Sequence, residues 1–210
     1  MAKNKYYAVK NGRQTGIFDN WEDCKAQVYS FSGAIYKGFP TLDEAKVYFE
    51  GQESRVSEGY ETEEEVMENI EDNHMIAYVD GSNKEDLAFS WGIVTFCKKL
   101  GRKDMNGMST NEEQAKYRNI AGELSASVNA IKFAIDNKMD KITIYHDYSG
   151  IRHWALGEWK TRNKLSKAYK EFFDKAKEYI EIEFVKVDGH TGDRFNEEAD
   201  VLAKKALGIM

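Results

Sequence analysis

Apolar and polar residues alternate with a period of two over residues 5–10, and a second short apolar run covers residues 15–18. The pair Asn11-Gly12 between these runs is a strong signal for a β-hairpin, because these residue types accept the backbone angles of a tight turn. Three more elements are predicted in this region: a helix over 20–28, a strand over 34–39 and, after Pro40, a helix over 42–49. The pattern therefore predicts a small ββαβα domain over residues 1–51.

A different pattern begins with the apolar run 75–79, which predicts a buried strand that halts at Asp80-Gly81-Ser82. The elements predicted after it are strands over 88–97 and 105–109, a helix over 120–137, a strand over 141–145, helices over 148–156 and 164–179, a strand over 180–187 and a helix over 196–207. Three strands followed by alternating helices and strands indicate an α/β domain with a mixed sheet. This domain is predicted to cover residues 74–210.

Residues 52–73 separate the two patterns and contain few apolar side chains and a run of glutamates. This composition predicts a flexible acidic linker, with at most a nascent helix around Glu63–Ile70. The formal net charge of −6 comes from this part of the chain, because residues 52–74 hold one basic and nine acidic residues, whereas the parts before and after each have a balance of +1. The net acidity therefore does not exclude a nucleic-acid partner for either domain.

The sequence contains no run of about 18 apolar residues, so it predicts no membrane span. Its start, MAKNKYY, lacks the apolar core of a signal peptide. The two cysteines, Cys24 and Cys97, lie in different predicted domains, which argues against a disulfide framework or a cysteine-based zinc site. We therefore expect a cytoplasmic protein in a reducing environment.

Four acids stand where a folded domain gains little from a charge: Asp80, Glu123, Asp147 and Asp200. Asp80 and Asp147 end predicted strands, and sites in open α/β sheets form outside the carboxyl ends of strands. Each acid alone has an ordinary explanation as a turn residue, a helix N-terminal charge, an N-cap or a solvated side chain. Converging carboxylates, however, repel one another without a cation, and purely oxygen ligands favour Mg²⁺ or Mn²⁺. Two such ions can clamp the attacking and departing oxygens of a phosphoryl displacement.

These acids lie in four sequence blocks: YVDGS (78–82), RNIAGELSA (118–126), YHDYSGI (145–151) and VDGHTGDRFNEEADVLA (187–203). The blocks resemble, in order, those of the type I ribonuclease H family, and the resemblance covers essentially all of residues 75–210. It implies a ribonuclease H-like fold with a five-stranded mixed sheet of order 3-2-1-4-5 flanked by helices. It also implies an endonuclease that hydrolyses the RNA strand of RNA–DNA hybrids by two-metal-ion catalysis, leaving 5′-phosphate and 3′-hydroxyl ends.

Carried over by position, the resemblance makes four residues both metal ligands and catalytic residues: Asp80, Glu123, Asp147 and Asp200. The implied cofactor is Mg²⁺, as two ions with substrate, with Mn²⁺ as an alternative. The resemblance also makes His190 a catalytic residue that assists product departure or shuttles protons, in a loop between Gly189 and Gly192. The other histidines are interpreted as structural: His74, His146 and His153.

The sequence departs from the family pattern around the substrate. The polar approach to Glu123 is reduced to Asn119, and a polar stretch beginning at Ser82 replaces the family's glycine-rich turn. The candidates for contacting RNA 2′-hydroxyls are therefore Ser82, Asn83 and Asn119. The family's basic protrusion is reduced to five residues that either hold the DNA backbone or, for the tryptophans, belong to the core: Trp154, Trp159, Lys160, Arg162 and Lys164.

Within residues 5–50, the spacings G-R-x-T-G-I-F, W-x-x-C-x-A-Q-V and Y-K-x-F-x-T-x-x-E-A resemble the viroplasmin-like hybrid-binding domain that precedes many such nucleases. The resemblance implies a nucleic-acid-binding surface made of Tyr7, Trp21, Tyr36 and Lys37. The aromatic rings would lie against the DNA sugar–phosphate backbone, and Lys37 would bind a phosphate. Gly38 replaces the usual second basic residue, which predicts modest affinity. The alternative interpretation places Trp21 and Tyr36 in the core.

The sequence thus predicts a ribonuclease H whose partner is an RNA–DNA hybrid, with no membrane and no obligate protein partner, acting as a monomer. Two rival functions stay open. One is a binding protein that keeps the nuclease fold without its chemistry, against which the complete set of acids and His190 argues. The other is a recombination or transposition nuclease, a class that typically carries additional DNA-binding domains.

Overall fold

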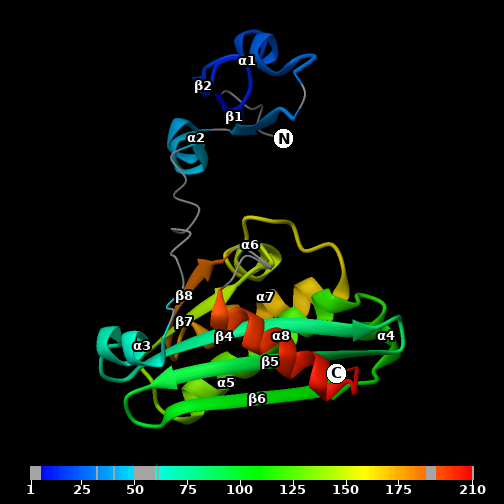
Figure 1. Ribbon diagram of the computed structural model, residues 1–210. Coiled ribbons are helices and arrows are strands. Elements are labelled where there is room, and N and C mark those ends of the chain that lie inside the picture. Colours follow the sequence, from blue (N-terminus) through cyan, green and yellow to red (C-terminus); the bar gives the residue numbers. More distant parts are fainter. Residues whose placement is uncertain are drawn as a thin grey trace. The chain divides into compact units, whose positions relative to one another are not determined.

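The computed structural model describes residues 6–31, 33–39, 41–49, 60, 62–187 and 193–209. The chain forms two compact units, Met1–Arg55 and Val56–Met210, and the division falls inside the segment predicted as an acidic linker. In Figure 1 the elements of the first unit run from dark to light blue, and those of the second from cyan to red.

The N-terminal unit is built on a three-stranded antiparallel sheet of order β2-β1-β3. Its elements are β1 (Tyr6–Asn11), β2 (Gly16–Phe18), α1 (Trp21–Val28), β3 (Ile35–Phe39) and α2 (Leu42–Phe49). Helix α1 begins where predicted, because the Asn20 side chain accepts a hydrogen bond from the backbone N–H of Asp23 at 2.9 Å. The predicted ββαβα order is confirmed.

Each face of this small sheet packs against one helix. On the first face Val9 of β1 packs with Cys24 and Val28 of α1. On the second face Ala8, the neighbour of Val9 in the strand, packs with Phe39 and with Ala45 of α2. Because successive strand residues point to opposite faces, a residue's position along a strand decides which of these two cores it joins.

The C-terminal unit contains a five-stranded sheet of order β6-β5-β4-β7-β8. Its strands are β4 (His74–Lys84), β5 (Ala88–Cys97), β6 (Gly101–Ser109), β7 (Lys141–His146) and β8 (Glu181–Lys186). The first three strands pair antiparallel, whereas β7 pairs parallel with both β4 and β8. Numbered within the unit, the order is 3-2-1-4-5, so the predicted mixed sheet is confirmed.

Helices cover both faces of this sheet: α3 (Glu63–Asn69), α4 (Glu112–Ala115), α5 (Asn119–Asp136), α6 (Gly150–Ala155), α7 (Lys164–Ala176) and α8 (Arg194–Ala206). Figure 1 shows α8 in front of the sheet and α5 behind it. On the α8 side the ring of Phe195 lies 5.3 Å from that of Tyr78 and 4.8 Å from that of Phe96, measured between centroids. All three side chains are fully buried, so α8 is anchored on the centre of the sheet.

The helix expected around Glu63–Ile70 is present, but this part of the predicted linker is not flexible, because it packs against the C-terminal unit. Residues Glu63–Asn69 form α3, whose N-cap Thr62 exchanges hydrogen bonds with Glu65 in a capping box. Val66 and Ile70, four residues apart and therefore on one helix face, are 0% and 2% exposed and belong to the core of the C-terminal unit. The glutamates dominate the composition, but the apolar residues at helical spacing face the core and attach the segment.

Strand β4 also differs from its prediction, because it continues past Asp80 to Lys84. Its parallel pairing with β7 ends at Tyr78, whereas its antiparallel pairing with β5 extends over Ser82 and Asn83. These two residues have the composition of a turn, yet the neighbouring strand satisfies their backbone groups.

Two smaller differences concern the elements that follow. Strand β6 begins at Gly101, before its predicted start at Met105, and the short helix α4 was not predicted. Within the parts of the chain that the structure describes, no helix is long and apolar enough to cross a membrane.

Candidate active site

Three of the four predicted acids meet at one point of the C-terminal unit. Asp80 lies on β4, Glu123 in the early part of α5, and Asp147 directly after β7. One carboxylate oxygen from each residue lies within 4.8 Å of those from the other two. We call this group the carboxylate cluster. It forms just beyond the last residues that pair β4 with β7, where strands with different neighbours separate.

Two glycines allow α5 to approach β4 closely enough to bring Glu123 to Asp80. A Cβ on Gly81 would lie 2.2 Å from the backbone nitrogen of Glu123, and a Cβ on Gly122 would lie 2.2 Å from the carbonyl oxygen of Ser90. A larger residue at either position would push the helix away from the strand. No role was predicted for Gly122 from the sequence. The sequence signal for this close contact is a glycine inside a predicted helix. Glycine there destabilises a helix by about 1 kcal/mol relative to alanine, so its presence indicates close packing.

The carboxylate cluster is buried and electrostatically unfavourable by itself. Asp80 is 7% exposed and Glu123 is 3% exposed. Burial raises the pKa of Asp80 to about 7, and the nearby charge of Asp147 adds to this effect. Burial also raises the pKa of Glu123 well above its usual range, with Asp80 as the next cause. A side-chain hydrogen bond between the two carboxyl groups raises the pKa of Glu123 and lowers that of Asp80, so a shared proton lies on Glu123.

The donors of the cluster fit a hard divalent cation. The backbone N–H of Gly81 donates to Asp80 Oδ1 at 2.6 Å, which fixes one carboxylate. Glu123 Oε2 is buried and has no hydrogen-bond partner among the described residues. A buried carboxylate oxygen without a partner is costly, and a cation bound by the three carboxylates would satisfy it and remove their repulsion. Oxygen-only ligands are those that Mg²⁺ and Mn²⁺ prefer.

Asp200, the fourth predicted ligand, lies on α8 and is not part of the carboxylate cluster. Its Oδ2 accepts a hydrogen bond from Lys204 Nζ at 2.5 Å, one turn further along the helix. Its charge nevertheless contributes to the raised pKa of Asp80, so Asp200 lies near the cluster. Helix α8 comes close at this point because a Cβ on Gly92 of β5 would lie only 2.0 Å from the carbonyl oxygen of Ala199.

His190 lies outside the described residues. The three histidines interpreted as structural all have contacts within the fold. His74 Nε2 lies 2.8 Å from Thr143 Oγ1, and His153 pairs with Glu158. His146 is 0% exposed, and burial lowers its pKa to about 3, so this ring is neutral at physiological pH.

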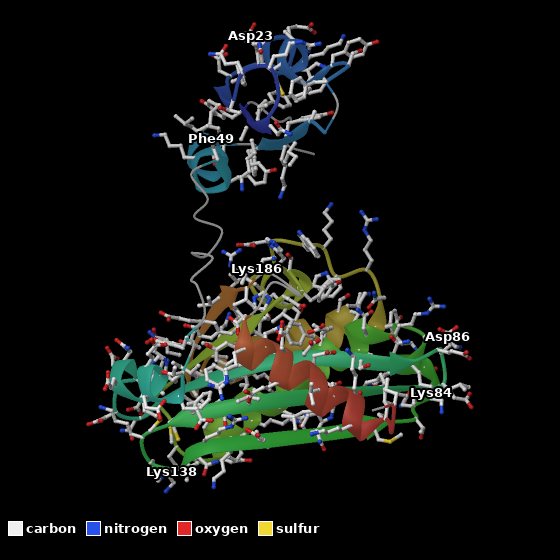
Figure 2. The ribbon with its side chains drawn as sticks, viewed as in Figure 1. Asp23, Phe49, Lys84, Asp86, Lys138 and Lys186 are labelled. Carbon is white, nitrogen blue, oxygen red and sulfur yellow. The ribbon has the colours of Figure 1, made fainter. Side chains whose placement is uncertain are left out.

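The predicted RNA-contacting residues lie near the carboxylate cluster in sequence and fold. Ser82 follows Asp80 on β4, and Asn119 is the exposed first residue of α5. The Asn83 side chain instead donates to the carbonyl oxygen of Glu85 at 3.0 Å, so it stabilises the turn between β4 and β5. Figure 2 labels Lys84 and Asp86 in this turn.

Aromatic rings line the surface from Asp147 towards the reduced protrusion. The ring centroid of Tyr148 lies 5.9 Å from that of Trp154, which lies 5.8 Å from that of Trp159. Trp154 is half-buried, whereas Trp159 is 37% exposed, so only the first is a core residue. The basic residues that follow are all exposed: Lys160, Arg162 and Lys164.

In the N-terminal unit, three of the four predicted surface residues lie together. The ring centroids of Tyr7 and Trp21 are 5.3 Å apart, and those of Trp21 and Tyr36 are 5.8 Å apart. Trp21 is 38% exposed and Tyr36 is 45% exposed. The alternative that placed these two rings in the core is therefore wrong. We call the three rings the aromatic cluster.

Lys37 does not join the aromatic cluster. It pairs with Ala8 across β1 and β3, and Ala8 belongs to the face covered by α2, whereas Tyr36 pairs with Val9 on the face covered by α1. The Lys37 ammonium lies 5.6 Å from the ring centroid of Tyr48 on α2. Adjacent strand residues point in opposite directions, so one flat surface cannot contain both Tyr36 and Lys37.

Comparisons with known proteins agree with this architecture. Residues 72–208 match the family model described as RNase H, and residues 5–49 match that described as Ribonuclease H1 N-terminal domain. Ribonuclease H1 of Homo sapiens is 28% identical over 253 aligned residues, covering 95% of this chain and 88% of the human protein. Ribonuclease H of Wolbachia pipientis wMel is 32% identical over 144 residues, covering 63% of this chain and 94% of that protein.

Among solved structures, RNase H1 from the halophilic archaeon Halobacterium salinarum NRC-1 has a similar fold, with a TM-score of 0.55 and 21% sequence identity. The similarity covers 65% of this chain and 99% of the archaeal one. The sheet order and the buried acids at its centre define a fold of the ribonuclease H class. Because the RNase H match spans residues 72–208, the chain belongs to the ribonuclease H family, whose members are endoribonucleases acting on RNA–DNA hybrids.

Proposed function

We propose that this protein hydrolyses the RNA strand of RNA–DNA hybrids and leaves 5′-phosphate and 3′-hydroxyl ends. The observation that carries the proposal is the carboxylate cluster, formed by Asp80, Glu123 and Asp147 at the centre of a ribonuclease H sheet. Membership of the family supports the substrate, and the buried acids argue against a binding protein that has lost the chemistry.

On this proposal the acids hold divalent cations. The carboxylate cluster provides the first ligands, and Asp200 joins them once its carboxylate leaves Lys204. Purely carboxylate donors support Mg²⁺, with Mn²⁺ as the alternative. When bound, a pair of such ions neutralises charge on the attacking and departing oxygens of the scissile phosphodiester.

Other residues of the chain orient the carboxylates, transfer protons or contact the substrate. The N–H of Gly81 orients Asp80, and Glu123 would bind a cation as a carboxylate, because metal ligands must be deprotonated. We assign His190 the transfer of protons to the departing oxygen, from its place in the sequence motif. Ser82 and Asn119 lie where they can contact RNA 2′-hydroxyls next to the cluster.

The N-terminal unit provides a separate hold on the hybrid. The aromatic cluster presents exposed rings on which sugars or bases can stack, and stacking of this kind tolerates any sequence. The proposed hybrid-binding domain covers residues 1–51. The proposed catalytic domain, predicted from residue 74, extends back to Tyr60, because α3 is part of its core.

A cleavage assay with Mg²⁺ on three substrates of one sequence tests the proposal: an RNA–DNA hybrid, duplex RNA and duplex DNA. We expect cutting of the RNA strand of the hybrid alone, inhibition by EDTA, and 5′-phosphate ends detected by mass spectrometry. Binding of the hybrid without cleavage would favour the binding-protein rival. Cleavage of duplex DNA would favour the recombination-nuclease rival.

A further inference from the structure

Arg102, at the start of β6, binds three carboxylates that come from three different elements. Its guanidinium contacts Glu63 of α3. It also donates to both carboxylate oxygens of Asp104 at 2.8 and 2.9 Å, and to Glu198 Oε2 of α8 at 2.5 Å. The Arg102 side chain is 25% exposed, so these bonds are partly shielded from water. A planar guanidinium with several fixed donors is suited to hold several carboxylates in one geometry.

Two of these partners, Glu63 of α3 and Glu198 of α8, lie in segments that are far apart in the sequence. Helix α3 falls between the family matches, which cover residues 5–49 and 72–208. Glu198 is two residues before Asp200 on α8 and also accepts a hydrogen bond from Arg194 Nε at 2.9 Å. Arg102 therefore ties the segment that precedes the ribonuclease H fold to the helix that carries the fourth acid.

Helix α8 has little freedom elsewhere near the sheet. The carbonyl oxygen of Ala203 accepts a hydrogen bond from Ser90 Oγ at 2.7 Å, and the backbone of Ala199 lies directly against Gly92. Glu198 and Asp200, two residues apart on a helix, point in directions about 200° apart. These contacts hold the side of α8 that faces the sheet, and the contact with Arg102 adds a restraint on the side away from Asp200.

We propose that Arg102 and Glu63 are positioning residues for Asp200, and that α3 is a brace that sets the rotation of α8 relative to the carboxylate cluster. The inference rests on the proposed function, since it concerns the acid expected to complete the cation site. Neither residue belongs to the carboxylate cluster. They act through Glu198, by holding the helix on which Asp200 is carried.

The test uses the full-length protein with Glu63→Gln and a matched control, Glu64→Gln, which removes the same charge from an exposed neighbour in the first turn of α3. Two readouts are needed: amide hydrogen exchange in α8, and the Mg²⁺ dependence of hybrid cleavage. We expect Glu63→Gln to speed exchange of the amides of 198–202, and to raise the Mg²⁺ concentration for half-maximal cleavage, each by about 3–10-fold. The KM for the hybrid should stay within about twofold, because substrate contacts are unchanged.

Arg102→Lys provides a second variant that keeps the charge but loses the planar fork, and we expect it to shift both readouts in the same direction. If Glu63→Gln lowers the melting temperature while α8 exchange and Mg²⁺ dependence match the Glu64→Gln control, α3 is only a stabilising element and the proposal fails. If the wild-type protein does not cut hybrids, the proposed function fails, whereas wild-type cutting with unchanged Mg²⁺ dependence in Glu63→Gln overturns the positioning role alone.

Discussion

The two candidate sites of this chain depart from ordinary folding in opposite ways. The carboxylate cluster buries charge, with Asp80 7% and Glu123 3% exposed. The aromatic cluster exposes large rings, with Trp21 38% and Tyr36 45% exposed. The first contains groups that would be more stable in water, and the second contains groups that would be more stable in a core.

This difference predicts how each site responds to change. On the proposed function, removing a buried charge should abolish cleavage and stabilise the metal-free fold, because the carboxylates repel one another when no cation is bound. Removing an exposed ring should weaken binding and leave both the fold and the chemical step unaffected. Substitutions that change only one of cleavage rate, stability and hybrid affinity therefore test the difference between the two clusters.

The largest effect is expected for Asp147→Asn. Losing one carboxylate from the cluster should lower the cleavage rate by at least about 10³-fold, because charge stabilisation at the reacting phosphate depends on the full set of ligands. Hybrid affinity in EDTA should stay at the wild-type value. Asp136→Asn, an exposed acid at the end of α5, is the matched control. Single-turnover cleavage within about tenfold of wild type would exclude Asp147 as a ligand.

The next effect concerns stability without metal. The pKa of Asp80 is about 7 in the folded protein against 3.8 as the ordinary value, so the folded state holds its proton more tightly. The unfolded chain ionises first, and this group therefore lowers the free energy of unfolding as pH rises from about 4 to about 7. Asp80→Asn should be more stable than wild type in EDTA at pH 8, by about 2 kcal/mol, and the difference should vanish near pH 4.

Thermal melting of both proteins across this pH range measures the effect. Equal melting temperatures at pH 8 would mean that the Asp80 carboxylate is not destabilising in the metal-free fold. A more stable Asp80→Asn variant that no longer cuts hybrids would show that the Asp80 carboxylate destabilises the metal-free fold and is needed for cleavage.

A smaller effect is expected at the aromatic cluster. Trp21→Ala should weaken hybrid binding about 10-fold, which is within the range of a single ring–base stack, while the rate at saturating hybrid stays unchanged. Tyr29→Ala is the control, since Tyr29 is 68% exposed in the same unit. A similar loss of affinity in both variants would argue against a defined binding surface.

The smallest effect is expected for Lys37→Ala. Because Lys37 lies on the face opposite the aromatic cluster, it can add only a peripheral phosphate contact, and we expect about a two- to threefold loss of affinity. The loss should shrink as salt rises, since the contact is electrostatic. Lys46→Ala, an exposed lysine on α2, serves as the control. A loss as large as that of Trp21→Ala would return Lys37 to the main binding surface.

The parts of the fold with strong periodicity could be predicted from the sequence. The alternating and apolar runs predicted the ββαβα unit and a mixed sheet, whereas the order of the five strands was implied by the resemblance to the family. Three of the four predicted acids converge. The helices and strands follow from local residue patterns, and the positions of the acids follow from the four sequence blocks that resemble the family. The close approach of α5 and β4 at Gly81 and Gly122 could not be predicted, because it depends on how two distant segments pack.

Two further errors have the same origin in composition. The glutamates of α3 favoured a linker with a nascent helix, although Val66 and Ile70 attach the segment to the core. The adjacent residues Tyr36 and Lys37 were assigned to one surface, although strand geometry sends them to opposite faces. In both cases the structure depends on the direction in which each side chain points. Residue composition alone does not specify that direction.

The separate sequence positions of the two sites also set an order of appearance during synthesis. The aromatic cluster needs only residues within 6–49, whereas the carboxylate cluster needs β4, α5 and β7 assembled, and α8 emerges last. At about 5–20 residues per second, translation from the end of α2 to the end of α8 takes about 10–30 s. On the proposed function, a nascent chain would for that interval bind nucleic acid before it has an assembled centre with which to cut it.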